Sequence, residues 1–275
     1  MGNRRFARET GGVCVAEPAV LFEVDDAVAT ITLNRPENRN SMTPDVLRAF
    51  EESVKRARCD RSLRAVVITG RGDSFCAGAD FKSRTGEGES GALPYEGAMR
   101  TYAPFLSVLD VEVPVIAALN GHAIGGGFGL ALVADIRVAN RDARYGANFA
   151  KLGIHTGMAI SYLLPRLIGV PRAVDLLFAA RVVTGAEAAE CGIAHCAVAP
   201  AEVPPEARRR AREIASCAPL AVRLIKRTFY RGLEWNPVAA AEREAWAQSA
   251  TFATNDAREG IRALLEKRAP HFEGR

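Results

Sequence analysis

The sequence lacks the residue patterns that several common classes of protein require. Its 6 cysteines form no CxxC pair and its 4 histidines are scattered along the chain, so neither supplies the ligand spacing of a structural zinc site. It has no apolar run long enough to span a bilayer and no secretory signal. These absences predict a reduced, cytoplasmic chain that holds no metal and does not enter a membrane.

Motifs that hold nucleotides or activate a serine are missing as well. The patterns G-x-x-x-x-G-K-[ST] and GxSxG do not occur. The glycine-rich stretch GHAIGGGFGLALVAD, residues 121–135, does not match the dinucleotide fingerprint GxGxxG, because Gly127 and Gly129 are followed by Leu132 where the third glycine would stand. The sequence therefore predicts no permanently bound nucleotide cofactor and argues against a serine hydrolase.

The charge balance is modest. The formal net charge is +4 and the isoelectric point is near 8.8. The densest basic run, EARRRARE at residues 206–213, has acidic flanks and is typical of a solvated helix face. Because no basic patch is interleaved with aromatic residues, the sequence favours no nucleic-acid partner. The slight positive excess suits a small anionic ligand.

What the sequence does contain is a series of strand–helix units followed by helices. Apolar alternation predicts a β-hairpin over 20–36, and helical periodicity predicts a helix over 43–57 with Thr43 as its N-cap. Short apolar runs predict further strands at 64–70, 114–121, 135–140 and 193–198. Residues 82–96 are polar and predict a loop, and the pattern is mostly helical after Ser161. This order predicts a single α/β domain with a helical C-terminal part.

Two glycine-containing turns follow buried strands at similar places. They are CAGAD at 76–80 and GHAIGGG at 121–127. Each can present backbone N–H groups from a turn with few side chains, and the second does so at a helix N-terminus, where the dipole favours negative charge. Two such turns that meet would form an oxyanion hole. The alternative, glycines needed only for packing, explains either turn alone, but the pair favours a site.

Here the sequence resembles the enoyl-CoA hydratase/isomerase (crotonase) superfamily, from about Ala19 to Phe272. The resemblance is carried by ITLNRPENRNSM, AVVITGRGDSFCAGADF, PVIAALNGHAIGGGFGLALVADIRVA, LPRLIG, ASCAPLAVRLIKR and FATNDAREGIRALLEKRAPHF. It implies a crotonase-like spiral of ββα units over 19–200 and a helical C-terminal region over 201–275 that mediates trimers, often paired as hexamers. The short, basic N-terminal sequence MGNRRFARETGG itself predicts a disordered lead-in over 1–18.

The resemblance also implies a ligand and a set of site residues. The ligand would be an acyl-CoA thioester, with coenzyme A as part of the substrate and no bound metal. The oxyanion-hole N–H groups would come from Ala79 and Gly126. Residues that would line the CoA channel are Asn38, Arg39, Ala77, Asp80 and Phe81. Phe252 and Lys267 would reach a CoA bound to the neighbouring subunit, although a solvated helix position would equally explain Lys267.

The chain departs from its relatives where their acid–base groups stand. Hydratase-type relatives carry two glutamates, at positions that here are Gly129 and Phe149. Relatives that isomerise dienes or displace a halide carry an aspartate at the position of Gly157. Water addition to a double bond needs one group to activate water and another to deliver a proton. Because neither glycine nor phenylalanine can exchange protons, true hydratase activity is in doubt.

A replacement acid–base group has few candidates. His155 follows the strand-like segment ANFAKLG, 147–153, and titrates in the useful range, although a hydrogen-bonded structural histidine is the alternative. His122 and Asp135 are expected to be structural, and nothing in the sequence pairs Cys76 with a base.

The sequence therefore predicts an enzyme of acyl-CoA metabolism, a lyase or isomerase that polarises a thioester carbonyl. Two alternatives remain open. One is a non-catalytic acyl-CoA binding protein, and the other is a CoA-thioester hydrolase or decarboxylase, which needs the oxyanion hole but not the paired glutamates.

Overall fold

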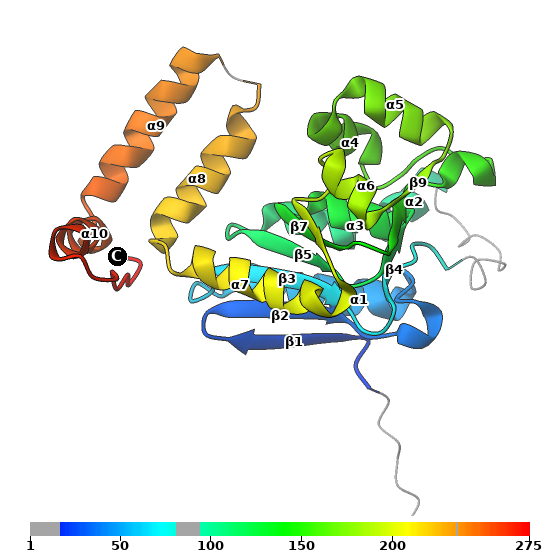
Figure 1. Ribbon diagram of the computed structural model, residues 1–275, viewed down its shortest axis with the longest axis horizontal. Helices are drawn as coiled ribbons and strands as arrows, with labels where there is room; N and C mark the ends of the chain where they lie inside the picture. Colours follow the sequence, from blue (N-terminus) through cyan, green and yellow to red (C-terminus); the bar gives the residue numbers. More distant parts are fainter. Residues whose placement is uncertain (1–16, 81–93, 235) are drawn as a thin grey trace, which may run out of the picture.

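The computed structural model describes residues 17–80, 94–234 and 236–275 of the chain (Figure 1). Almost all of the predicted lead-in at 1–18, the predicted CoA-channel residue Phe81 and most of the predicted loop at 82–96 lie outside these residues.

The described strands form two sheets. The larger has six strands in the order β1-β2-β3-β5-β7-β10, and the smaller has four in the order β4-β6-β8-β9. The strands are β1 (Val20–Asp25), β2 (Val28–Leu33), β3 (Ala65–Gly70), β4 (Ser74–Cys76), β5 (Val115–Leu119), β6 (His122–Ile124), β7 (Ile136–Asn140), β8 (Arg144–Gly146), β9 (Val182–Thr184) and β10 (Cys196–Val198). The β1–β2 hairpin is antiparallel and turns at Asp26 and Ala27, whose φ angles are 47° and 64°, as a tight hairpin turn requires.

The strands alternate between the sheets as the chain advances. In each of the pairs β3/β4, β5/β6 and β7/β8, the first strand joins the larger sheet and the second joins the smaller one. Equivalent strands of successive pairs are parallel neighbours: β3 pairs with β5, and β4 pairs with β6. This confirms the predicted crotonase-like spiral of ββα units.

Ten α-helices are described, together with short 3₁₀ helices. They are α1 (Pro44–Cys59), α2 (Pro94–Leu106), α3 (Gly126–Val133), α4 (Ile160–Ile168), α5 (Val170–Phe178), α6 (Gly185–Glu190), α7 (Val203–Ala215), α8 (Pro219–Gly232), α9 (Pro237–Phe252) and α10 (Asn255–Glu266). The 3₁₀ helices are η1 (Pro36–Asn38), η2 (Ser107–Asp110), η3 (Phe149–Leu152) and η4 (Pro200–Glu202).

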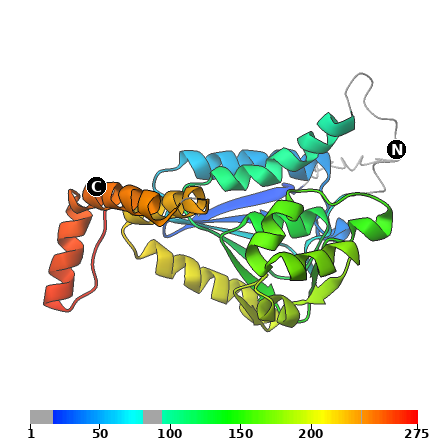
Figure 2. The ribbon, with the colours of Figure 1, turned by 90° about the horizontal axis from the view of Figure 1, so that it is seen from above.

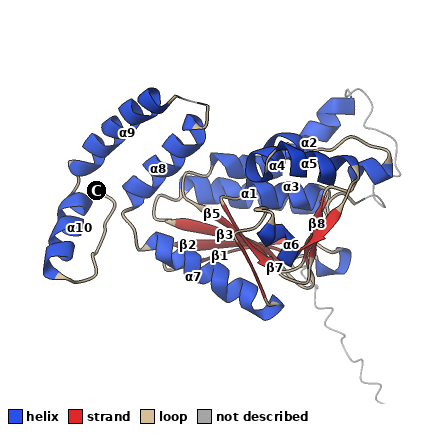
Figure 3. Ribbon diagram, turned by 45° about the horizontal axis from the view of Figure 1, so that its top comes forward, coloured by secondary structure: helices blue, strands red, loops and turns tan. Residues whose placement is uncertain are grey.

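The larger sheet is covered on both faces, so its central strands read as continuous apolar runs. Val66 and Ile68 of β3 pack into the core on the side of α1 and α3, whereas Ala65 and Val67 pack against α7. This alternation is the period of two that side chains follow along a strand. Figures 2 and 3 show α7 and α1 on opposite sides of the strands. The sheet thereby fixes the turns at its strand ends on a rigid scaffold.

Helices α8, α9 and α10 extend away from this body (Figure 1). A partly buried ion pair ties α8 to it: Lys226 Nζ lies 2.7 Å from Asp135 Oδ2 and donates to Val113 O at 2.9 Å. Asp135 Oδ2 also accepts a hydrogen bond from Val115 N, which gives this carboxylate a structural role.

Several local predictions were wrong. Helix α2 begins at Pro94, so the predicted loop over 82–96 is helical in its last residues, and the helix itself was not predicted. The segment 147–153, predicted as strand-like, contains the 3₁₀ helix η3 instead. The strand predicted over 193–198 is confined to 196–198. Thr43 stands at the N-cap of α1 as predicted, but its hydroxyl donates to Asp45 and does not cap the helix.

Candidate active site

The two glycine turns meet in space. Strand β4 pairs with β6, with Cys76 opposite Ala123, so the turns that follow both strands lie at the same edge of the smaller sheet. A Cβ built on Gly78 at ideal geometry would lie 3.0 Å from Gly126 N, and one built on Gly126 would lie 3.7 Å from Gly78 Cα. The CAGAD turn and the GHAIGGG turn are therefore in direct backbone contact.

This contact depends on glycine. A Cβ on Gly127 would overlap Cys76 O, and one on Gly121 would overlap Asp73 O. Gly78 has a φ of +85° and Gly125 one of +57°, in the region that side chains disfavour. Glycine at these positions thus allows two backbone segments to approach each other more closely than any other residue would.

The amides at this junction are unused. Gly126 is the first residue of α3, where backbone N–H groups have no intrahelical acceptor. Within the described part of the chain, neither Ala79 N nor Gly126 N donates a hydrogen bond. The helix dipole adds partial positive charge at the same end. Two free donors beside a helix N-terminus can stabilise an oxygen that carries negative charge.

A third loop, from the ITLNRPENRNSM motif, joins the junction. Ala77 N donates to Arg39 O at 3.0 Å, and Met42 N donates to Gly78 O at 2.8 Å. Two residues expected to line a CoA channel, Arg39 and Ala77, are thereby brought together, and Asn38 precedes Arg39 at the end of η1. The Arg39 side chain is exposed.

Asn40 fixes this loop, and sequence reasoning missed it. Its side chain is fully buried. Its amide donates to Ser74 O at 2.8 Å and Arg71 O at 3.0 Å, while its carbonyl oxygen accepts from Arg35 N at 2.8 Å. The only sequence signal is a polar residue in a turn that follows a strand. The role itself depends on which backbone groups the fold leaves nearby.

Two further expected CoA contacts, Phe252 and Lys267, lie elsewhere in the chain. Phe252 is at the end of α9 and is 61% exposed, and Lys267 follows α10 in a left-handed conformation. Both belong to the C-terminal helices that extend away from the body (Figure 1). Within one chain they are not brought to the glycine turns.

Positions 129, 149 and 157 are those where the sequence lacks the carboxylates that the resemblance would imply. Large side chains lie at or beside each of them. A Cβ on Gly129 would overlap Met158 Cβ, and Met158 is buried with a φ of +58°. The Phe149 ring reaches to 3.7 Å from a Cβ built on Gly125. A Cβ on Gly157 would overlap the hydroxyl of Tyr102, which comes from α2. The surroundings of the turns are therefore a thioether, an aromatic ring and a phenol.

The remaining titratable candidates have other surroundings. His155 is exposed, and its Nδ1 lies 2.6 Å from Thr156 O. His122 Nδ1 accepts a hydrogen bond from Arg144 N at 2.9 Å and so links two strands of the smaller sheet. Burial raises the pKa of the Cys76 thiol to about 12, so this cysteine stays protonated at neutral pH and is a poor nucleophile.

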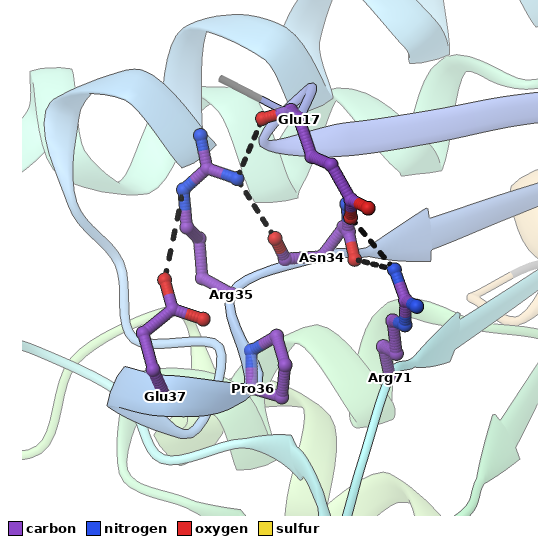
Figure 4. A pocket seen from close by; sticks show the side chains of 6 residues that line it. All are labelled: Glu17, Asn34, Arg35, Pro36, Glu37 and Arg71. Carbon is purple, nitrogen blue, oxygen red and sulfur yellow. Dashed lines mark hydrogen bonds and ion pairs between the residues drawn. The ribbon is translucent and has the colours of Figure 1, made fainter. Parts of the chain in front are cut away.

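A separate groove lies beside the end of β2 (Figure 4). It is lined by Glu17, Asn34, Arg35, Pro36, Glu37 and Arg71. Arg71 Nη1 lies 2.8 Å from a carboxylate oxygen of Glu17, and Arg35 Nε lies 3.2 Å from Asp45 Oδ2. The Asn34 amide and Arg71 lower the pKa of Glu17. Both guanidinium groups are thus paired with carboxylates of the same chain, which makes this groove a weaker anion site than the glycine junction.

The described residues contain no cluster of three or more potential metal ligands. None of the helices described here has both the length and the apolar composition needed to cross a bilayer.

Comparison with known proteins identifies the family of this chain. The sequence model of the family described as Enoyl-CoA hydratase/isomerase matches residues 23–275. The chain belongs to this family. It is 36% identical to the crotonyl-CoA hydratase of Syntrophomonas wolfei over 254 residues, which is 92% of this chain and 97% of that protein. It is 34% identical to the (E)-benzylidenesuccinyl-CoA hydratase of Thauera aromatica, covering 93% of this chain and 99% of that one.

Solved structures of family members have the same fold. The crystal structure of an enoyl-CoA hydratase from Bacillus anthracis matches with a TM-score of 0.89 at 33% identity, covering 94% of this chain and all of that one. Membership in the family and the predicted fold are therefore confirmed.

Proposed function

We propose that this family member binds an acyl-CoA thioester and holds its carbonyl oxygen between the backbone N–H groups of Ala79 and Gly126. The observation that carries the proposal is the contact between the two glycine turns, which leaves two unused amides at a helix N-terminus. Such a pair of donors matches the charge that develops on a thioester oxygen when an enolate or a tetrahedral intermediate forms.

The same junction suits the rest of the ligand. Arg39 and Ala77 meet at one side of it, and an exposed guanidinium can bind a phosphate through charge-assisted hydrogen bonds. Relatives in the family are named for reactions of CoA thioesters. The coenzyme would arrive as part of the substrate and leave with the product.

The reaction we propose is a lyase or isomerase step without paired glutamates. Phe149 cannot exchange protons, and Met158 occupies the space into which a side chain at position 129 would extend. The two amides can still stabilise an enolate. No carboxylate at position 129 or 149 is present to activate water. His155 is exposed and remains a candidate acid–base group that awaits a test.

The arrangement of subunits belongs to the same proposal. Phe252 and Lys267 lie on the C-terminal helices, far from the glycine turns of their own chain. In a trimer or a pair of trimers they would contact the CoA of a neighbouring subunit.

A panel of CoA thioesters incubated with the protein and read by mass spectrometry tests the proposal. The panel contains saturated, unsaturated, β-oxygenated and β-carboxylated acyl groups. We expect an isomer or a cleaved acyl product from at least one of them. A free acid would indicate a hydrolase, and loss of carbon dioxide a decarboxylase. Binding without any conversion would indicate an acyl-CoA binding protein. Absence of binding at millimolar ligand would overturn the proposal.

A further inference from the structure

Tyr102 lies beside the proposed acyl site, and no sequence motif points to it. It is on α2, which packs against α3, and its hydroxyl occupies the space that a side chain at position 157 would need. Relatives with an aspartate at this position would place a carboxylate there. In this chain a phenol from α2 supplies the polar group.

The hydroxyl of Tyr102 is available to a ligand. The ring is half-buried and packs against the hydrophobic core, so its position is fixed. In the described part of the structure, Tyr102 Oη has no hydrogen-bond partner. The neighbouring hydroxyl of Thr156 is buried and also lacks a partner. The Tyr102 hydroxyl is not among the fully buried atoms that lack a partner, so a ligand oxygen can replace water there.

A series of contacts connects the oxyanion turn with Tyr102. Gly129 stands three residues after Gly126 in α3, which is about 5 Å along a helix at 1.5 Å per residue. Gly129 contacts Met158, and Met158 follows Gly157, beside which the Tyr102 hydroxyl lies. An acyl group that extends from Gly126 along α3 toward Gly129 would therefore approach the Tyr102 hydroxyl.

We infer that Tyr102 is a specificity-determining residue, whose hydroxyl donates a hydrogen bond to an oxygen on the acyl chain beyond the thioester carbonyl. The inference rests on the proposed function. It predicts that the protein prefers acyl groups that carry a hydroxyl or keto oxygen near the third carbon. Phe149 and Met158 supply apolar surroundings, in which one hydrogen bond discriminates more strongly than it would in water.

A matched pair of ligands and of variants tests this inference. Acetoacetyl-CoA and butyryl-CoA have acyl chains of equal length and differ by one keto oxygen on the third carbon. Dissociation constants are measured by calorimetry for the native protein, Tyr102→Phe and the control Tyr162→Phe. The control loses a hydroxyl from an exposed ring that packs under Arg166. Mass spectrometry after each titration checks that the ligands are unchanged.

We expect the native protein and Tyr162→Phe to prefer acetoacetyl-CoA by about tenfold, which corresponds to roughly 1.4 kcal/mol. Tyr102→Phe should bind both ligands equally, with its affinity for butyryl-CoA unaltered. A native protein that binds both ligands without preference, or a preference that survives in Tyr102→Phe, would overturn the inference and leave the proposed function standing. Failure of the native protein to bind either ligand would overturn the proposed function itself.

Discussion

Met158 and Gly129 are in such close contact that a Cβ on Gly129 would overlap the Cβ of Met158. This contact leaves no room for a longer side chain at position 129, where the family resemblance would place a glutamate. Met158 is buried with a left-handed backbone, which the surrounding structure holds in place. Glycine at position 129 and the position of Met158 thus belong to one packing arrangement.

The first prediction concerns hydration of crotonyl-CoA, followed by the loss of enoyl absorbance. The native protein should be a poor hydratase, because general acid–base groups contribute about 10²–10⁴-fold each and both carboxylates are missing. The double variant Gly129→Glu/Phe149→Glu should be destabilised by overlap with Met158. Adding Met158→Gly removes the overlap and suits the φ of +58°, so this triple variant should fold and gain detectable activity.

Circular dichroism of each variant is the control for folding, since two buried carboxylates can themselves destabilise a protein. Efficient hydration by the native chain would contradict the account and direct attention to His155 as a replacement base.

This packing also shows which features of the fold and the site could be predicted from the sequence. The two glycine turns were predictable, because each contains glycine directly after a buried apolar strand. Helix α2 was not, because Gly97 and Pro104 lie inside it and interrupt the helical pattern. Contacts such as Met158 with Gly129 and Tyr102 with Gly157 join segments far apart in the chain, and only the folded structure reveals them.

Arg39 should contribute to CoA binding through charge. Its side chain is exposed beside the junction, so Arg39→Ala should weaken acyl-CoA binding several-fold and reduce the dependence on salt. Screening of exposed charges over about 10 Å at 0.1 M ionic strength is the reason for that dependence. The matched control is Arg208→Ala, an exposed arginine of α7 far from the junction in sequence. Calorimetry at two salt concentrations measures both effects, and equal losses for the two variants would refute a specific role.

The C-terminal helices should mediate a trimer or a multiple of three. Leu264 and Leu265 are each 78% exposed on α10, which is unusual for adjacent large apolar side chains. Light scattering should give at least three chains at micromolar concentration. Leu264→Glu/Leu265→Glu should dissociate the assembly, whereas Arg262→Ala on the same helix should not. A stable native monomer would be evidence against this assembly.

Cys76 should resist alkylation in the native protein. Because burial raises the pKa of its thiol to about 12, the thiolate is scarce at pH 8, whereas Cys59 and Cys217 are exposed. Mass mapping after iodoacetamide treatment should find the label on the exposed cysteines and on Cys76 only after unfolding. In the unfolded chain the thiol ionises near pH 8.5, so Cys76 should lower the free energy of unfolding as pH rises above that value. Rapid labelling of Cys76 without unfolding would show that its site opens.

The central claim, that the amides of Ala79 and Gly126 bind a thioester oxygen, is tested most directly by isotope-edited infrared spectroscopy. The probe is butyryl-CoA with ¹³C at the thioester carbonyl, which reports hydrogen bonding whether or not a reaction follows. Binding to the native protein should shift the carbonyl stretch to lower frequency, because two donors polarise the bond. Gly126→Val, whose side chain would meet Met42 and enter the junction, should bind with little or no shift. An unshifted carbonyl band in the native complex, or an equal shift in a folded Gly126→Val variant, would show that the thioester oxygen lies elsewhere.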